Sequence, residues 1–387
     1  MLDFTFHNAT KIIFGRDTEK KVGEEISKLG KKVLFHYGGG SIKKTGLYDR
    51  VVESLKEAGV EIFELGGVKP NPRLSLVKEG IELCRKNGID AILAVGGGSV
   101  IDSAKAIGIG VPYEGDAWDF YSKGKKVEEM LPLGVVLTIP AAGSESSGGS
   151  VITNEDGRYK RSTNSVNMRA KFAIMNPELT FTLPNYQTAV GAVDIMSHVM
   201  ERYFTNVKNV DFTDRLCEAT LRTMIRNTPI ALKEPENYDA RAEIMWAGTI
   251  AHNDLLSTGR IGDWATHGME HELSAIYDIA HGGGLAIMWA PWMTYVYKHD
   301  IERFAQFAYR VWDVEPDFRN PEKAALEGIK RLKEFFASLG IPVTLTDAGI
   351  PDDRFDEMAK KATEDGPLGQ FVKLYKDDVK KIYELAK

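Results

Sequence analysis

Five residues in the second half of the chain have types and spacing that could do chemistry together. Asp194 and His198 stand four apart in the stretch GAVDIMSHVME, whose apolar spacing predicts a helix, so both side chains share one face. His267 and His271 are also four apart and His281 follows, so three of the eight histidines fall within 15 residues. A site of one carboxylate with three of these four imidazoles suits Fe²⁺ or Zn²⁺ better than Ca²⁺ or Mg²⁺. The pattern favours a metal site over isolated core histidines.

A second interpretation of the same residues is a zinc hydrolase. The stretch from His267 to His271 matches H-x-x-E-H, the inverted metalloprotease helix, in which Glu270 would be the general base. This pattern is short and occurs often by chance. It also leaves the glycine-rich turns of the N-terminal half without a role, so we rank it lower.

The first of these turns follows the apolar run DAILAV at 90–95 and precedes an expected helix at 100–108. Its residues are Gly96, Gly97, Gly98 and Ser99. The unpaired N–H groups and positive dipole of a helix N-terminus suit a phosphate, and glycine lets it approach the backbone. The spacing G-x-G-x-x-G is not met, because Ile101 stands where the third glycine belongs. The turn alone fits a pyrophosphate site and a simple strand-to-helix connection equally.

A second glycine turn ends the expected strand 32–37. Its residues are Gly38, Gly39, Gly40 and Ser41. Enzymes that select NAD usually carry an Asp or Glu here, which bonds the adenosine 2′-hydroxyl and would repel a 2′-phosphate. This turn has no acid, and Lys43 and Lys44 follow it closely. The combination favours NADP(H) over NAD(H), although two lysines also suit a solvated helix start.

A third stretch of small residues, PAAGSESSGG at 140–149, follows the expected strand 133–139. Its hydroxyls could line a ligand cleft. Without other evidence it fits a surface loop better.

The elements that must position these residues fall into two parts. Up to Leu183 and Pro184, strands alternate with helices, which predicts a parallel sheet with helices on both faces. The expected strands are 32–37, 60–65, 90–95, 133–139 and 171–175, and the expected helices are 47–58, 73–87 and 100–108. Long helical stretches follow at 187–205, 211–227, 239–257 and 322–338. We expect a Rossmann-like α/β dinucleotide-binding domain over 1–185 and an all-α metal-binding domain over 186–387.

Composition excludes several classes of protein. The 387 residues carry a net charge of −6, which argues against a nucleic-acid-binding surface. Apolar residues make up 43% and charged residues 27%, as in soluble globular proteins. No window of 18 apolar residues indicates a membrane span, and no signal peptide is evident. Cys84 and Cys217 are too few for a disulfide framework, so we expect a cytoplasmic protein.

Taken together, these residues resemble the iron-containing (group III) alcohol dehydrogenase family over essentially the whole chain. Within that family, the chain most resembles the butanol dehydrogenase and broad-range aldehyde reductase branch. The matching stretches are YGGGSIKKTG at 37–46, GGGSVID at 96–102, GSES at 143–146, VDIMSH at 193–198 and DWATHGMEHEL at 263–273, closing with His281. The resemblance implies a Rossmann-like domain, a helical domain and an active site between them.

The resemblance also implies roles for individual residues. The metal ligands would be Asp194, His198, His267 and His281. His271 would lie beside the metal and pass the proton. Gly97, Gly98 and Ser99 would hold the pyrophosphate, with Asp102, Thr138 and Ser144 near the cofactor and Lys160 at its ribose. Gly39 falls where NAD-using relatives carry Asp, whereas Ser147 departs from the Asn of some branch members.

The activity implied is a metal-dependent, NAD(P)-linked interconversion of small primary alcohols and aldehydes such as butanol and butanal. The metal, Fe²⁺ with Zn²⁺ as a rival, would polarise the substrate oxygen while hydride moves to or from nicotinamide C4. The family also implies a homodimer in which a strand within 4–14 pairs between subunits.

Glycerol dehydrogenase and dehydroquinate synthase resemble the chain more distantly. A synthase must grip a carboxylate and a phosphate, yet the only basic residues near 194–201 and 263–284 are Arg202 and Arg260. A non-catalytic NADP-binding protein is a further alternative, and the complete ligand set argues against it.

Overall fold

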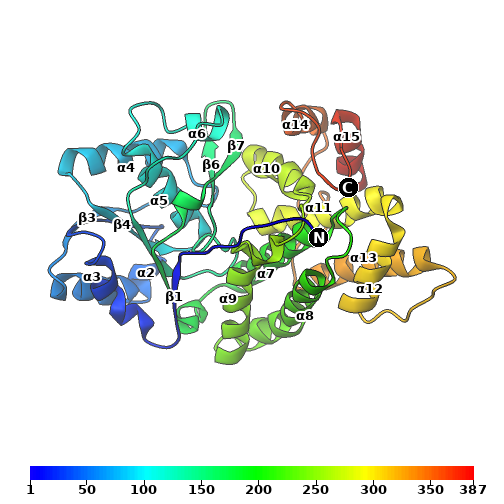
Figure 1. Ribbon diagram of the computed structural model, residues 1–387, viewed down its shortest axis with the longest axis horizontal. Helices are drawn as coiled ribbons and strands as arrows, with labels where there is room; N and C mark the ends of the chain where they lie inside the picture. The colour runs from blue at the N-terminus through cyan, green and yellow to red at the C-terminus, as the bar shows by residue number, and fades with distance from the viewer. The chain divides into compact units, whose positions relative to one another are not determined.

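The computed structural model describes residues 1–387, which form two compact units (Figure 1). The α/β unit comprises His7–Leu183 and Pro235–Asn253. The helical unit comprises Met1–Phe6, Pro184–Glu234 and Asp254–Lys387. The sequence predicts two contiguous domains, 1–185 and 186–387. In the structure, residues 1–6 belong to the helical unit and residues 235–253 to the α/β unit.

The α/β unit is built on a six-stranded parallel sheet in the order β1-β8-β5-β4-β2-β3. Its strands are β1 (Lys11–Phe14), β2 (Lys32–Tyr37), β3 (Glu61–Leu65), β4 (Ala91–Gly96), β5 (Leu133–Leu137) and β8 (Phe172–Met175). β4 is buried along its whole length because it lies between β2 and β5 and is covered on both faces. The parallel sheet expected from sequence is confirmed.

Alternate strand residues supply two apolar cores, one on each face of the sheet. Leu34 and Ile92 belong to the core formed with α4 and α5, whereas Val33 and Leu93 belong to the core formed with α1 and α3. Figure 1 shows α3 on one side of the strands and α4 and α5 on the other. The helices of this unit are α1 (Val22–Ile26), α2 (Ser41–Lys44), α3 (Leu47–Glu57), α4 (Leu74–Asn87), α5 (Gly98–Gly110), α6 (Asp119–Ser122) and α9 (Tyr238–His252), with 3-10 turns at Thr18–Lys21, Val166–Met168 and Pro177–Thr180.

Two features of this unit were not expected from sequence. An antiparallel ribbon pairs β6 (Gly149–Asn154) with β7 (Tyr159–Asn164), outside the main sheet. The helix α9 also packs in this unit, where Trp246 meets the ring of Phe14 edge-on and Thr249 donates to the buried Glu145 at 2.6 Å. It ends at His252, so the expected helix 239–257 is shorter than predicted.

The helical unit consists of α-helices joined by loops and two 3-10 turns. The helices are α7 (Asn185–Tyr203), α8 (Asp211–Lys233), α10 (Ala265–Tyr277), α11 (His281–Val296), α12 (Ile301–Val311), α13 (Pro321–Ser338), α14 (Phe355–Ala362) and α15 (Lys376–Leu385), with 3-10 turns at Leu255–Ser257 and Tyr297–His299. α7 packs against α8 and α11, and α10 packs against α11 and α14. None of the helices combines the length and apolar character needed to cross a membrane.

Candidate active site

The candidate metal ligands come from three neighbouring helices of the helical unit. Every residue of α7 from Thr188 to Tyr203 is buried, so Asp194 and His198 lie in the interior of the unit. His267 is in the first turn of α10, and His281 is the first residue of α11. Asp194, His267 and His281 each offer a ligand atom, and these three atoms lie within 4.8 Å of one another. Tertiary packing thus brings together residues far apart in the sequence.

His281 lies at the more accessible side of this cluster. Its Nε2 is 3.7 Å from Asp194 Oδ1, and its side chain is 24% exposed against 5% for Asp194.

His198 flanks the three converging residues. Its Nδ1 lies 3.4 Å from Asp194 Oδ1, one helical turn away, and its ring centroid is 4.8 Å from that of His267. All four predicted ligands are therefore neighbours, with His198 beside the closest trio rather than part of it.

The donor atoms fit a divalent cation. His267 Nδ1 donates to Glu201 Oε1 at 2.7 Å, which leaves Nε2 as the nitrogen with a free lone pair. That Nε2 is buried and has no hydrogen-bond partner. A buried polar atom without a partner costs stability, and a cation among the imidazoles and Asp194 would compensate it.

His271 lies at the edge of the cluster. It is half-buried on α10, and its ring centroid is 5.6 Å from that of His281. Glu270, His271 and His281 also offer ligand atoms within 4.8 Å of one another, and Glu270 accepts a hydrogen bond from His281 Nδ1.

Glu201 and Glu270 were not identified as imidazole partners from sequence. For Glu201, the only sequence feature that pointed to the metal site was its spacing from Asp194 and His198, which places all three residues on one helical face.

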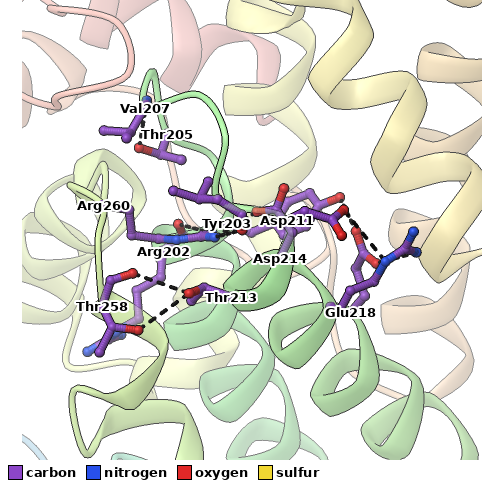
Figure 2. A network of polar contacts seen from close by, with 12 residues as sticks. Arg202, Tyr203, Thr205, Val207, Asp211, Thr213, Asp214, Glu218, Thr258 and Arg260 are labelled. Carbon is purple, nitrogen blue, oxygen red and sulfur yellow. Dashed lines mark hydrogen bonds and ion pairs between the residues drawn. The ribbon is translucent and has the colours of Figure 1, made fainter. Parts of the chain in front are cut away.

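A buried network of ion pairs lies beside the ligand-bearing part of α7 (Figure 2). Arg202 donates from Nη1 to the backbone oxygen of His198 at 2.7 Å and from Nε to Ser257 Oγ at 2.8 Å. Arg260 donates to the backbone oxygen of Arg202 at 3.2 Å and pairs with Asp214 Oδ1 at 2.8 Å. Both guanidinium groups are thus engaged within the protein.

The predicted cofactor residues lie in the α/β unit, several of them at the carboxyl ends of β2 and β4. Gly97 caps α5, and Gly98 and Ser99 form its first turn. A Cβ on Gly98 would lie only 2.8 Å from the Ala142 Cβ, so glycine is needed for this close approach. The Val100 and Ile101 N–H groups donate to the Gly97 oxygen, so Gly98 and Ser99 are the residues whose N–H groups stand at the positive end of the helix dipole, where an anion is favoured.

Asp102 and Ser144 contact each other. Ser144 Oγ donates to Asp102 Oδ1 at 2.5 Å, and the Val151 N–H donates to Oδ2 at 2.9 Å. Burial raises the pKa of Asp102. Lys105, on the same helix, donates to the backbone oxygens of Ser144, Ser147 and Gly149 at 2.7 to 2.9 Å. These contacts hold the small-residue stretch 140–149 against α5, so it is anchored rather than a free surface loop.

The remaining predicted cofactor contacts are spread along this unit. Thr138 is half-buried just beyond β5, and its N–H donates to the Gly96 oxygen at 3.0 Å. Lys160, on β7, is buried and donates to Asn71 Oδ1 at 3.0 Å.

The turn after β2 has open space at its glycines. A Cβ on Gly39 or Gly40 would meet nothing within 4 Å. The Lys43 ammonium lies 4.6 Å from the Tyr48 ring centroid, and the Tyr48 hydroxyl donates to Glu64 at 2.6 Å. An aromatic and acidic neighbourhood thus positions Lys43 close to this turn.

Comparison with known proteins identifies the family. Residues 9–177 match the model described as iron-containing alcohol dehydrogenase, and residues 188–387 match the C-terminal model of the Fe-containing alcohol dehydrogenase family.

Full-length relatives support this match. The chain is 44% identical to "NADH-dependent butanol dehydrogenase A" of Clostridium acetobutylicum, with 99% of each chain covered. It is 38% identical to an "NADPH-dependent aldehyde reductase" of Escherichia coli, with 100% of each covered. The crystal structure of NADH-dependent butanol dehydrogenase A from Thermotoga maritima superimposes with a TM-score of 0.96 at 44% identity, covering 100% of this chain and 99% of that one. The chain therefore belongs to the iron-containing alcohol dehydrogenase family of oxidoreductases.

Proposed function

We propose that this protein interconverts small primary alcohols and aldehydes, butanol and butanal among them, using a nicotinamide nucleotide. The observation that carries the proposal is the convergence of Asp194, His267 and His281 around a buried imidazole nitrogen that has no hydrogen-bond partner. The names of the Clostridium and Escherichia relatives agree with this substrate class.

We assign the metal to Asp194, His198, His267 and His281, with Fe²⁺ as the ion and Zn²⁺ as the alternative. When bound, the cation supplies Lewis acidity toward the substrate oxygen, and the dinucleotide supplies or accepts hydride at nicotinamide C4. The buried ligand helices exclude water from the inner side of the site, which strengthens electrostatic interactions there. His271, half-buried beside His281, passes the proton of the substrate hydroxyl to or from solvent.

The basic residues near the ligands are engaged within the protein, which favours a substrate without a carboxylate or phosphate. Arg202 and Arg260 are already engaged by backbone oxygens, Ser257 and Asp214, so neither is available to a substrate carboxylate or phosphate. This engagement argues against a dehydroquinate synthase-like reaction.

The nucleotide site is proposed in the α/β unit. Its residues would be Gly38, Gly39, Gly40, Ser41, Lys43, Gly97, Gly98, Ser99, Asp102, Thr138, Ser144 and Lys160. We favour NADP(H) over NAD(H), because the space at Gly39 carries no acid and Lys43 is close in sequence. The names of the relatives weigh the other way, since the Bacillus and Clostridium butanol dehydrogenases at 42–49% identity are named NADH-dependent and the Escherichia reductase at 38% NADPH-dependent.

Two further proposals concern the assembly and its compartment. β1 is an edge strand of the sheet, which leaves one side of it to pair with a second copy in a homodimer. Cys84 and Cys217 are buried free thiols, which suits a cytoplasmic location.

The decisive experiment is butanal reduction by the purified protein with NADPH and NADH compared side by side. The assay is run after chelation and after restoring Fe²⁺ or Zn²⁺. We expect metal-dependent turnover that favours NADPH and is lost in His267→Ala. The control variant His299→Ala, which changes an exposed histidine of the helical unit, should match the parent. A preference for NADH would overturn only the cofactor assignment, whereas no turnover by the metal-loaded protein would overturn the proposed activity.

A further inference from the structure

Two fully buried carboxylates contact the imidazoles of the candidate metal site. Glu201 and Glu270 each have 0% side-chain exposure. Glu201 Oε1 lies 2.7 Å from His267 Nδ1, and Glu270 Oε2 accepts from His281 Nδ1. In both pairs the nitrogen in contact is Nδ1, so the same ring nitrogen of each imidazole is engaged by a carboxylate.

The two pairs join the three ligand-bearing helices in series. Glu201 follows Asp194 on α7 and reaches His267 on α10. Glu270 lies on α10 and reaches His281, which begins α11. Each of the first two helices thus supplies a candidate ligand and also a carboxylate that holds the imidazole of the next helix.

This contact selects one tautomer of each imidazole. A carboxylate only accepts hydrogen bonds when ionised, so Nδ1 carries the proton and Nε2 keeps a lone pair. The lone pair on Nε2 is what a metal ion binds. His267 Nε2 is buried without a hydrogen-bond partner, as expected for a nitrogen kept for a ligand.

Glu201 is itself held in place by further donors. The Trp264 N–H donates to its Oε2 at 2.6 Å, and the His267 N–H donates to its Oε1 at 3.1 Å. The Thr266 hydroxyl also donates to Oε1. These donors belong to the N-terminus of α10, where a negative charge is favoured by the helix dipole. The carboxylate therefore has a defined position from which to orient the His267 ring.

Glu270 is confined by close packing. The Ser274 hydroxyl donates to it from the next turn of α10. A Cβ on Gly284 of α11 would lie 2.7 Å from Glu270 Cγ, so only glycine at this position lets α11 approach so closely. The approach places His281 within reach of the carboxylate.

We propose that Glu201 and Glu270 are positioning residues that fix the tautomer and ring orientation of His267 and His281, an inference that rests on the proposed metal site. Neither carboxylate needs to contact the metal or the substrate. Outer partners of this kind typically contribute 10–100-fold to metal affinity.

The test titrates Co²⁺ into the metal-free protein and follows its visible absorption, which reports affinity and ligand geometry without any activity assay. We expect Glu201→Gln and Glu270→Gln to weaken Co²⁺ binding by about 10–100-fold and to alter the spectrum. Thr266→Val, which removes one donor to Glu201 but keeps the charge, should weaken binding by a few-fold.

Glu218→Gln is the matched control, because Glu218 is a buried acid of the same unit that bonds Tyr203 and not an imidazole. Its Co²⁺ affinity should stay within about twofold of the parent. Equal weakening in this control would overturn the proposal, since general destabilisation would then explain every variant. Unchanged affinity and spectra in both glutamine variants would overturn it directly. If Glu201→Gln does not fold, the proposal is decided by the Co²⁺ affinity and spectrum of Glu270→Gln, because Glu270 caps no helix. If the parent itself binds no Co²⁺, the proposed metal site fails instead.

Discussion

The ammonium nitrogen of Lys105 lies 2.7 Å from the backbone oxygen of Ser144. Lys105 also donates to the Ser147 and Gly149 oxygens, so one side chain holds the stretch that follows β5. Burial lowers the pKa of Lys105 to about 8, because the charged form is costly in the interior. The carbonyl contacts compensate part of this cost, which identifies Lys105 as an anchor for the proposed cofactor loop.

Replacing Lys105→Met should disorder that loop, because three backbone oxygens lose their donor at about 1–3 kcal/mol each. We expect the KM for NADPH to rise at least tenfold, with a much smaller change in the KM for butanal. Steady-state kinetics with each substrate varied in turn measure both constants. The control Lys171→Met changes an exposed lysine of the same unit and should leave both KM values unchanged. An equal rise in both KM values would contradict the assignment.

His36 predicts acid sensitivity of the α/β unit. It is fully buried between the Leu65 oxygen and Ser103 Oγ, and burial lowers its pKa from 6.5 to about 4. The unfolded chain therefore binds more protons than the folded one between these values, so stability falls as pH drops through this window. The full shift corresponds to about 3 kcal/mol. The free energy of unfolding, measured in urea at pH 4 to 7, should show this slope. Hydrogen exchange of the β2 amides should show the same dependence on pH.

The variant His36→Gln cannot titrate, so its stability should depend less on pH over the same range. His7→Gln, at an exposed position, should keep the slope of the parent. A parent-like slope in His36→Gln would assign the acid sensitivity to other groups.

Much of the fold could be predicted because it depends on local pattern. β4 is a short apolar run that follows Gly88 and ends in a glycine-rich turn, which is typical of a strand buried on both faces. The ribbon of β6 and β7 was missed, because most residues of YKRSTN are polar and carry no alternating apolar signal.

The candidate site was only partly predictable for a different reason. Asp194 and His198 share one helical turn, so spacing alone brings them together. Glu201 and Glu270 were missed as imidazole partners, since their roles depend on how α7, α10 and α11 pack. Likewise, the sequence does not distinguish Lys105 from other helical lysines, because its role depends on its contacts with residues 144–149.

Gly39 offers a direct test of nucleotide selection. Its position has room for a side chain, so Gly39→Asp should be accommodated without a clash. The new carboxylate would repel a 2′-phosphate and could bond a 2′-hydroxyl. We expect kcat/KM to fall at least tenfold with NADPH and to stay level or rise with NADH. Gly39→Ala, which adds a Cβ without charge, should change kcat/KM with either nucleotide by no more than about twofold. Equal losses with both nucleotides would show that the position does not discriminate between them.

Removing the metal should destabilise the helical unit. An ion that binds only the folded state stabilises it by about 4 kcal/mol when its concentration is 1,000 times its Kd. Calorimetry of the chelated and the Fe²⁺- or Zn²⁺-restored protein should therefore show a lower Tm without metal. In Asp194→Ala this difference should largely disappear, whereas Asp313→Ala, at an exposed site, should retain it. A Tm that is the same with and without metal in the parent would contradict the proposed ligand set.

Asp214 is the centre of the buried ion-pair network of the helical unit (Figure 2). Its Oδ1 pairs with Arg260 at 2.8 Å and its Oδ2 with Arg303 at 2.6 Å, and all three side chains are buried. Asp214→Asn would leave two guanidinium groups buried without their charge partner, which typically costs about 3–5 kcal/mol. Chemical unfolding should show this loss.

Asp211→Asn is the matched control for that substitution. Asp211 pairs with Arg310 at 3.2 Å but is exposed, and exposed pairs contribute at most about 1 kcal/mol. The contrast between neighbouring acids on α8 therefore isolates burial as the cause. A loss in Asp214→Asn no larger than in Asp211→Asn would mean that water reaches the network and screens its charges.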